Sequence, residues 1–328
     1  MSFLKPKDII EEGDTVILYL SVQSMHAIEV APTIKNKKGE TIEYIFQTCF
    51  GALKVCNLIG VAYGSKVQLS RGWAYVLQPN PELWTVTLPH RTQIIYTPDI
   101  SMILFQLEVR PGSVVIESGT GSGSLSHYFL RALKPSGTLH TFDFHETRAT
   151  QAREEFQRHG LGKFVSVYHR DVCQSGFSDE LNGKADAVFL DLPAPHEVIP
   201  HAVKAFKSKG EENIFLYALN AVSIHLSIGG RFCSFSPCIE QSQRCCMALQ
   251  EHGFTEIRSM EILQNEDIVK TKLMPVIDLE FLKHKVRGLF CNHNEIRPDF
   301  WQPTILLFSM RYDGNFFSPF DFSIRFAS

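Results

Sequence analysis

Two short segments of this 328-residue chain carry residue types that could bind a ligand and act on it. The first, residues 114–124, reads Val-Val-Ile-Glu-Ser-Gly-Thr-Gly-Ser-Gly-Ser, an apolar strand that runs into three glycines and a helical sequence. Glycines let the backbone turn sharply and let a ligand approach closely, because they have no Cβ. The second, residues 186–195, is an apolar strand that ends at Asp191 and is followed by Pro193 and Pro195, which stiffen the turn. The sequence therefore predicts a ligand site beside a fixed carboxylate.

The spacing of the glycines limits the class of ligand that this turn could bind. Gly119, Gly121 and Gly123 are followed by Ser124, where a dinucleotide fingerprint would need its third glycine, and no Gly-Lys-Ser/Thr of a phosphate-binding loop is present. An acid before the glycines, Glu117, suits an ammonium group better than a pyrophosphate. Glu-x-Gly-x-Gly-x-Gly resembles the first motif of class I S-adenosylmethionine-dependent methyltransferases. The alternative is a glycine turn that only packs a helix against a strand.

Acids also end the next two predicted strands. Asp143 closes one of them, where a carboxylate can accept hydrogen bonds from both ribose hydroxyls of a nucleoside. Arg148, one helical turn later, could clamp that edge or be a simple surface cation. Asp171 and Val172 follow the third strand, where the resembled fold places an acid near an adenine amine and an apolar side chain on the ring. For Asp171 the alternative is a solvated turn residue.

Around these residues the sequence predicts two kinds of structure. Residues 1–85 show short alternating apolar runs cut by turn residues, among them 15–20, 41–46, 53–59 and 66–77, which is typical of a small antiparallel β-module. Pro79, Pro81 and Pro89 indicate a linker. From Thr97, which we expect to cap a helix that has Pro98 in its first turn, helices alternate with apolar strands. This pattern predicts a Rossmann-like α/β domain with a parallel sheet over residues 86–328.

The composition excludes several classes of protein. With 44% hydrophobic and 20% charged residues the chain has ordinary globular composition. Its net charge of −3 lacks the excess positive charge of a stand-alone nucleic-acid binder, so a polyanion would be bound by local patches or a partner's charge. The longest apolar stretch, residues 214–228, is too short to span a membrane, and residues 1–12 lack an apolar signal-peptide core, so we expect an intracellular protein. Eight cysteines without a Cys-x-x-Cys pair predict reduced, buried thiols and no metal site.

Six segments together resemble one family. They are residues 88–99, 117–124, 142–148, 170–173, 189–193 and 230–240. These segments resemble the catalytic subunits of eukaryotic tRNA (adenine-58-N1)-methyltransferases, over roughly residues 1–264 apart from one insertion. The resemblance implies a β-module followed by a Rossmann-like methyltransferase domain, residence in the nucleus, and a heterotetramer of two catalytic and two non-catalytic, tRNA-binding subunits. It also implies S-adenosyl-L-methionine as methyl donor, held by Ile95, Glu117, Gly119, Gly121, Ser122, Gly123, Ser124, Asp143, Arg148, Asp171, Val172 and Asp191.

The same resemblance implies a catalytic role for Asp191. Its segment is similar to the Asp/Asn-Pro-Pro-aromatic motif of N-methyltransferases, with Leu192 inserted; the alternative is a residue that only caps the next helix. Adenine N1 has an in-plane lone pair and needs no general base, whereas the methylated ring becomes cationic. An ionised carboxylate that accepts a hydrogen bond from the N6 amine would stabilise that charge. Candidate RNA contacts are His90, Arg91 and Arg71 beside Trp73, with the basic stretch Lys35, Lys37 and Lys38.

The chain departs from the family pattern at three places. His196 stands where the family usually has Trp, residues 208–228 form an atypical insertion, and residues 265–328 are divergent, although 303–310 could form a last strand. Two other functions therefore stay open at this point. One is a methyltransferase with a small-molecule or protein substrate, and the other is a non-catalytic subunit that binds RNA or a partner.

Overall fold

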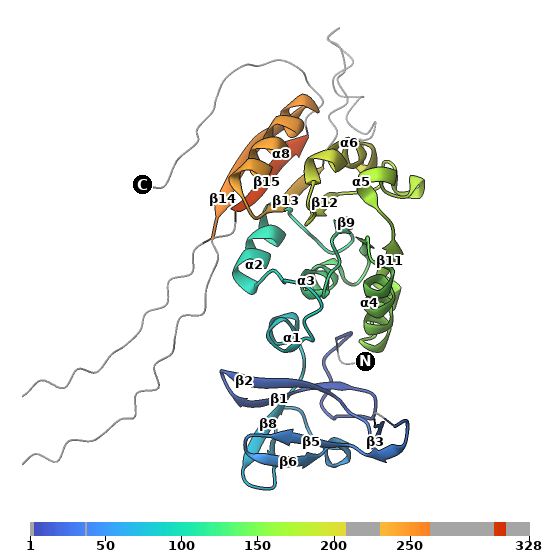
Figure 1. Cartoon of the computed structure of the whole chain (residues 1–328), viewed down its shortest axis with the longest axis vertical. Helices are drawn as coiled ribbons and strands as arrows, with labels where there is room; N and C mark the ends of the chain where they lie inside the picture. Colours follow the sequence, from blue (N-terminus) through green and yellow to red (C-terminus); the bar gives the residue numbers. More distant parts are fainter. Residues whose placement is uncertain (1–2, 37, 208–229, 263–304, 313–328) are drawn as a thin grey trace, which may run out of the picture.

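The computed structural model describes residues 3–36, 38–207, 230–262 and 305–312, the last of these as backbone only. In this part of the chain a small β-module lies at one end of the molecule and an α/β domain at the other (Figure 1). The insertion predicted at 208–228 and nearly all of the divergent stretch 265–328 lie outside the described residues.

The β-module confirms the antiparallel prediction. Strands β1 (Thr15–Ser21), β2 (Ser24–Glu29), β7 (Lys66–Gln68) and β8 (Trp73–Leu77) form a sheet in the order β2-β1-β8-β7. Two hairpins join β3 (Thr33–Lys35) to β4 (Thr41–Glu43) and β5 (Ile45–Thr48) to β6 (Gly51–Lys54). The strand predicted for 53–59 is wrong in its second half, because the 3₁₀ turn η1 (Val55–Leu58) follows β6 and buries Val55 and Leu58, three residues apart. That spacing matches the period of a 3₁₀ helix.

The prediction of a proline linker needs correction, because this segment contains a helix. Helix α1 (Pro81–Thr87) begins after Asn80, whose side chain accepts a hydrogen bond from the Leu83 amide, and Pro81 stands at its first position. Trp84 is buried, and the helix contacts β1 and β2 on one side and α3 on the other. The linker therefore fastens the module to the α/β domain, and the predicted boundary at residue 85 falls inside α1.

The second sheet has the order β11-β10-β9-β12-β13-β15-β14. Its strands are β9 (Val114–Ser118), β10 (Thr138–Asp143), β11 (Val165–His169), β12 (Ala187–Leu190), β13 (Arg231–Ser236), β14 (Phe254–Glu261) and β15 (Ile305–Tyr312). The pairs among β11, β10, β9, β12 and β13 are parallel, while β15 runs antiparallel to both its neighbours, so the predicted last strand is confirmed. Chain order reverses between β9 and β12, which is where open α/β sheets bind ligands.

Both faces of this sheet are covered, which explains the continuous apolar strands. One buried cluster joins Val115 and Phe189 to α2 (Thr97–Gln106), α3 (Ser124–Leu133) and α4 (Glu146–Arg158). The other joins Ile116 and Val188 to α5 (Val172–Ser175), α6 (Pro195–Ala205) and α8 (Ile239–Glu251). Neighbouring residues of one strand thus enter opposite layers. The short 3₁₀ turns η2 (Gly162–Phe164) and η3 (Asp179–Leu181) complete the described elements.

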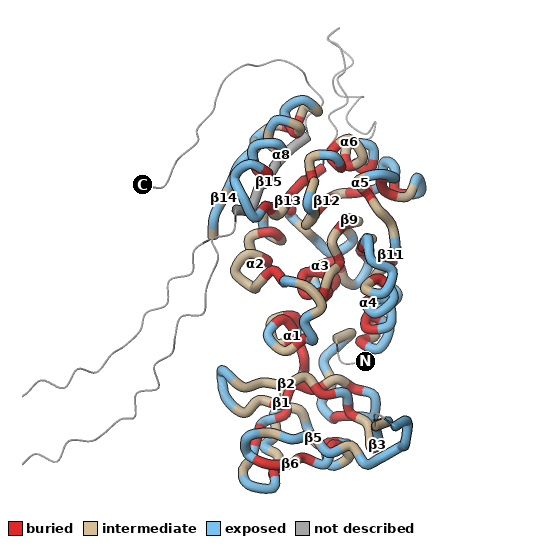
Figure 2. Tube along the Cα trace, viewed as in Figure 1, coloured by how far each residue is buried: buried red, intermediate tan, exposed pale blue. Residues whose placement is uncertain are grey.

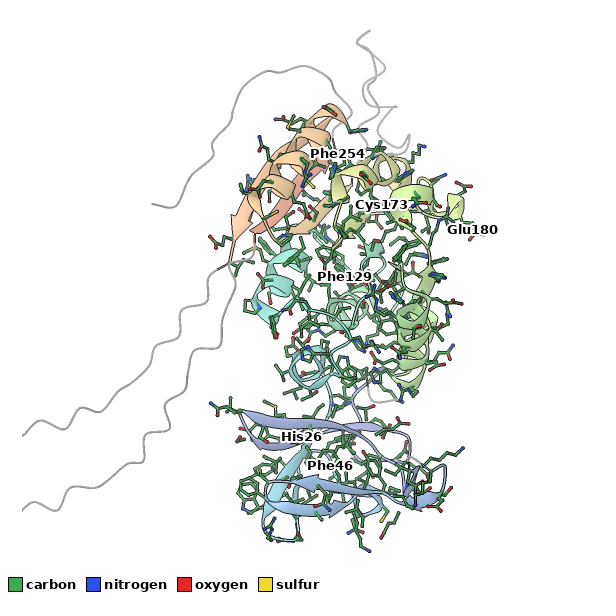
Figure 3. All side chains as sticks on the ribbon, viewed as in Figure 1. His26, Phe46, Phe129, Cys173, Glu180 and Phe254 are labelled. Carbon is green, nitrogen blue, oxygen red and sulfur yellow. The ribbon has the colours of Figure 1, made fainter. Side chains whose placement is uncertain are left out.

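The buried layers are separate in space. Phe129 marks the first cluster and Phe254 the second, while Phe46 packs on the core of the β-module (Figure 3). The outward side of α4 and α8 is exposed, and the strands between the helices are buried (Figure 2). The Rossmann-like α/β class predicted from the sequence is confirmed.

Two local predictions need correction. Tyr96, not Thr97, is the N-cap of α2, and the Thr97 hydroxyl instead pairs with the Tyr128 hydroxyl at 2.7 Å. The cysteines of the described part are unpaired, as expected, but Cys49 and Cys238 are exposed and only Cys233 and Cys245 are fully buried. Within the described residues, no helix combines the length and apolar character needed to cross a membrane.

Candidate active site

The glycine turn between β9 and α3 has the backbone that its sequence predicts. Gly119, Gly121 and Gly123 have φ angles of +100°, +53° and +76°, a region that side chains with a Cβ rarely adopt. A Cβ on Gly119 would lie 2.4 Å from the carbonyl oxygen of Asp191, and one on Gly121 would lie 2.7 Å from the Thr92 hydroxyl oxygen. The glycines therefore allow two other segments to pass close to the turn.

These segments enclose a cavity of about 210 Å³ at the carboxyl ends of β9, β10 and β12. Its wall is lined by Thr92, Gln93, Ile94, Ile95, Glu117, Gly119, Thr120, Gly121, Ser122, Gly123, Ser124, Leu125, Asp143, Arg148, Phe189 and Asp191. Ten of the twelve residues predicted to hold the donor lie in this wall. A glycine cradle with three carboxylates fits a nucleoside that also carries positive charge.

Glu117 is fully buried below the glycine turn. Burial, with a smaller contribution from the neighbouring charges of Asp191 and Asp143, raises the pKa of Glu117 from 4.5 to about 7, while hydrogen bonds from Ser126 and Thr141 oppose the shift. The Ser126 hydroxyl donates to the carboxylate at 2.6 Å. Near neutral pH this acid is therefore poised between its neutral and ionised forms, and a cationic group in the cavity would favour the ionised form.

Asp191 reaches the cavity from the end of β12. Its backbone amide donates to the Ser118 carbonyl at 2.8 Å, so the main chain is held by the sheet. Burial raises the pKa of the Asp191 carboxyl from 3.8 to about 6. In the described part of the chain its carboxylate accepts no hydrogen bond, which leaves the group available to a ligand. Helix α6 is capped at Ala194, so Asp191 is not the cap of that helix.

Asp143 lines the cavity from the end of β10. Its carboxylate accepts hydrogen bonds from the Gly121 amide at 3.0 Å, the His145 amide at 2.8 Å and the Arg148 guanidinium at 3.0 Å. The residue is 3% exposed. Arg148 therefore holds the Asp143 carboxylate in place, while the contact of Asp143 with a ribose stays a prediction.

Asp171 and Val172 do not line the cavity. The Asp171 carboxylate caps α5 by accepting hydrogen bonds from the Cys173 and Gln174 amides at 3.0 and 3.4 Å. Val172 is buried in the second core cluster. Their contact with an adenine ring stays a prediction, and a donor extending beyond Asp143 would have to reach them.

The predicted RNA contacts fall into two groups. His90 and Arg71 are exposed, and Lys66 lies over the ring of the exposed Trp73 with its ammonium 3.9 Å from the ring centroid. Arg91 is 15% exposed, and its guanidinium is paired with Glu155 at 3.1 Å. The RNA contacts stay predictions, and for Arg91 the structure shows an internal partner.

The sequence reasoning missed Thr92, Gln93, Ile94, Thr120, Leu125 and Phe189 as wall residues. Three of them lie in the segment 88–99, whose similarity to the family was itself the signal. For Phe189 the sequence predicts only a position in an apolar strand and does not indicate that it lines the cavity.

A buried cluster of possible metal ligands is formed by residues of α3 and of the C-terminal end of α4. One ligand atom each of His127, Glu155 and His159 lies within 4.8 Å of the others. The two imidazoles already share a hydrogen bond of 2.9 Å, and Glu155 is paired with Arg91. These pairings account for the cluster without an ion, and the predicted absence of a metal stays a prediction.

Comparison with known proteins places this geometry in a family. The model of the family described as "tRNA methyltransferase complex GCD14 subunit" matches residues 72–216 and 216–295, more than half of the chain. The tRNA (adenine(58)-N(1))-methyltransferase catalytic subunit TRM61 of Candida albicans is 43% identical over 265 residues, which cover 80% of this chain and 70% of that protein. The chain belongs to this family of methyltransferase catalytic subunits.

Two other catalytic subunits of this family are also similar to the chain. The catalytic subunit trmt61a of Dictyostelium discoideum is 39% identical over 264 residues, covering 79% of this chain and 75% of that protein. The Cryptococcus neoformans TRM61 subunit is 44% identical over 257 residues, but the match spans only 52% of its length. The predicted resemblance is therefore confirmed.

Solved structures confirm the fold. A SAM-dependent O-methyltransferase from Thermotoga maritima has a TM-score of 0.67 and 24% identity, covering 92% of this chain and 95% of that one. The tRNA (m1A58) methyltransferase TrmI from Aquifex aeolicus has a TM-score of 0.63 and 18% identity, covering 93% and 99%. The cavity lies at the reversal of strand order, where open α/β sheets generally bind ligands.

Proposed function

We propose that this chain is the catalytic subunit of a tRNA methyltransferase that transfers a methyl group from S-adenosyl-L-methionine to N1 of adenosine 58 in the T-loop of tRNA. Its membership of the family supports this function. The observation that carries it is the position of Asp191 in the wall of the glycine-lined cavity, where its backbone is fixed by the sheet and its carboxylate has no hydrogen-bond partner among the described residues.

The residues present fit S-adenosyl-L-methionine. Ser122, Ser124 and the three glycines form a cradle, which side chains would partly fill if other residues replaced the glycines. Ile95 adds an apolar side chain to the wall. Glu117 lies where it would face the donor's ammonium, and Asp143, fixed by Arg148, would accept the ribose hydroxyls. When bound, the donor supplies a methyl group on a cationic sulfur, which an incoming lone pair can attack.

The chain's contribution to the reaction is positioning and electrostatics. Asp191 would accept a hydrogen bond from the N6 amine of the target adenine, which orients N1 toward the methyl group. As N1 gains the methyl group the ring becomes cationic, and the ionised Asp191 stabilises that charge. Residues 92–95 line the cavity and would shield part of a bound donor from solvent. The target base must leave the folded T-loop, which costs on the order of a few kcal/mol.

A second, tRNA-binding subunit belongs to the same proposal. The name of the matched family model refers to a complex, and the related proteins are named catalytic subunits. The chain's net charge of −3 suits a partner that supplies much of the phosphate-binding surface. We assign the chain to a heterotetramer of two catalytic and two non-catalytic subunits that works in the nucleus, with His90 and Arg71 as its own RNA contacts.

A radiolabelled methyl-transfer assay tests the function. Unmodified tRNA is incubated with the labelled donor and the chain, with and without its co-purified partner, and the methylated position is mapped by primer extension. We expect label on adenosine 58 only when the partner is present. Label on a protein or small molecule, or no transfer to tRNA by the complex, would contradict the proposal.

A further inference from the structure

The segment 88–96 passes over the glycine turn and forms one wall of the donor cavity through residues 92–95. It connects α1, which is packed on the β-module, to α2 of the α/β domain. Most of it lacks regular secondary structure. Its position against the turn must therefore be fixed by side chains.

Ser122 of the glycine turn binds this segment through its side-chain hydroxyl. Its hydroxyl oxygen accepts hydrogen bonds from the Arg91 amide at 2.9 Å and the Thr92 amide at 3.1 Å. The Thr92 hydroxyl lies 3.2 Å from the same oxygen. Since a Cβ at Gly121 would meet that Thr92 hydroxyl, the contact also depends on glycine in the turn.

The Arg91 guanidinium adds a second connection. One terminal nitrogen, Nη2, donates to the Ser122 carbonyl at 2.9 Å, and both terminal nitrogens reach the Glu155 carboxylate, at 3.1 and 3.4 Å. Glu155 belongs to α4, the helix that follows Asp143. Nη2 would also lie 3.8 Å from a Cβ on Gly123. One side chain thus joins the wall segment, the glycine turn and α4.

The burial of this pair makes the loss of either partner costly. Glu155 is 3% exposed and Arg91 15%. Burial raises the pKa of Glu155, and the charge and hydrogen bonds of Arg91 act against that shift. A buried carboxylate that loses its cationic partner is strongly destabilised. An exposed arginine that reads phosphates would not be enclosed in this way.

We propose that Arg91 is a positioning residue that fixes the 88–96 segment against the glycine turn and thereby sets the affinity for the methyl donor. This inference rests on the proposed function only for the identity of the donor. It replaces the sequence-based interpretation of Arg91 as an RNA contact.

The test compares Arg91→Gln with wild type in the complex with its partner subunit. Binding of S-adenosylhomocysteine is measured by calorimetry, and KM for tRNA is measured at several salt concentrations. We expect the donor-product dissociation constant and the KM for the donor to rise about tenfold, with kcat, KM for tRNA and its salt dependence unchanged. Arg131→Gln, which removes an exposed bidentate pair with Glu82, is the matched control and should leave all of these values unchanged.

A phosphate contact gives the opposite pattern. Donor affinity would stay at the wild-type value, while binding to tRNA would weaken and its salt slope would fall by about one. That result, or no change in any value, would overturn the proposal. A wild-type complex that binds S-adenosylhomocysteine but methylates no tRNA would refute the proposed function and leave the Arg91 result intact.

Two further variants separate positioning from folding. Arg91→Gln combined with Glu155→Gln removes the stranded carboxylate, so the melting temperature should recover while donor affinity stays low. Recovery of donor affinity as well would mean a merely structural role and would overturn the proposal. Arg91→Lys keeps the charge but cannot span both partners with a planar fork, so an intermediate affinity is expected; wild-type affinity would also overturn it.

Discussion

Replacing Asp191 by asparagine should increase stability while removing most of the activity. The change is almost isosteric, and within the described residues the carboxylate accepts no hydrogen bond that would be broken. Burial raises the pKa of Asp191 from 3.8 to about 6, and this difference corresponds to about 3 kcal/mol by which the fold disfavours the ionised form. Above pH 6 the wild-type chain bears this penalty and Asp191→Asn does not.

The same quantity sets the scale of the kinetic effect. If the cationic adenine recovers that energy in the transition state, loss of the charge lowers the rate by roughly 100-fold, the size seen when one preorganised electrostatic group is removed. Because Asp191 is placed by its backbone bond to Ser118, donor affinity should change much less than kcat.

Single-turnover methyl transfer at saturating donor measures this rate, and chemical denaturation measures stability. A variant that keeps more than about a tenth of the wild-type rate, or one that loses rate and stability together, would refute the reasoning. Asp186→Asn is a useful comparison for stability, because that half-buried acid lies directly before the same strand, where it pairs with Lys207 and accepts a hydrogen bond from the Val114 amide at 2.7 Å, so its replacement should cost stability rather than increase it.

Three further predictions follow from the same geometry. Gly119→Ala forces a side chain into a φ of +100° and against the Asp191 carbonyl, so we expect a loss of roughly 1–3 kcal/mol of stability and of nearly all donor binding; unchanged calorimetric binding of S-adenosylhomocysteine would contradict the cradle. Donor affinity should rise with pH from 5.5 to 8, because Glu117 and Asp191, with pKa values raised to about 7 and 6, must ionise to meet a cation. The stability of the unliganded protein should change in the opposite direction and fall as pH rises from 4.5 through 7, and Glu117→Gln should flatten the upper part of both the affinity and the stability profile. A thiol reagent should modify Cys49 in the native protein and spare Cys233, which is buried and whose thiol has a raised pKa; mass spectrometry of the labelled peptides would show the reverse if the core assignment were wrong.

Most of the fold followed from the sequence because its signals are local. The continuous apolar strands, the glycine turn and the acids at the strand ends predicted a parallel sheet, and carboxyl ends of neighbouring parallel strands meet at one edge. Glu117, Asp143 and Asp191 accordingly line the same cavity. The wall residue Phe189 escaped it, since an apolar residue in a strand has the same signal whether it faces a core or a cavity.

Errors arose where a residue's role depends on a distant partner. Pro79, Pro81 and Pro89 read as a linker, although Asn80 and Pro81 together are also a helix start, and only packing of Trp84 decides between them. For Arg91, predicted as an RNA contact, that role stays a prediction, but its pairing with Glu155, 64 positions away in the sequence, was not predicted. No local pattern reports a pairing of that separation.

The central claim is that Asp191 faces the reacting base beside a donor held by the glycine turn. Its most direct test is an experimental structure of the complex with S-adenosylhomocysteine and substrate tRNA. We expect the product in the cavity between Ser122 and Asp143, and the Asp191 carboxylate within hydrogen-bonding distance of N6 of the everted adenine 58. An empty cavity, or an Asp191 side chain turned away from the base, would contradict the account.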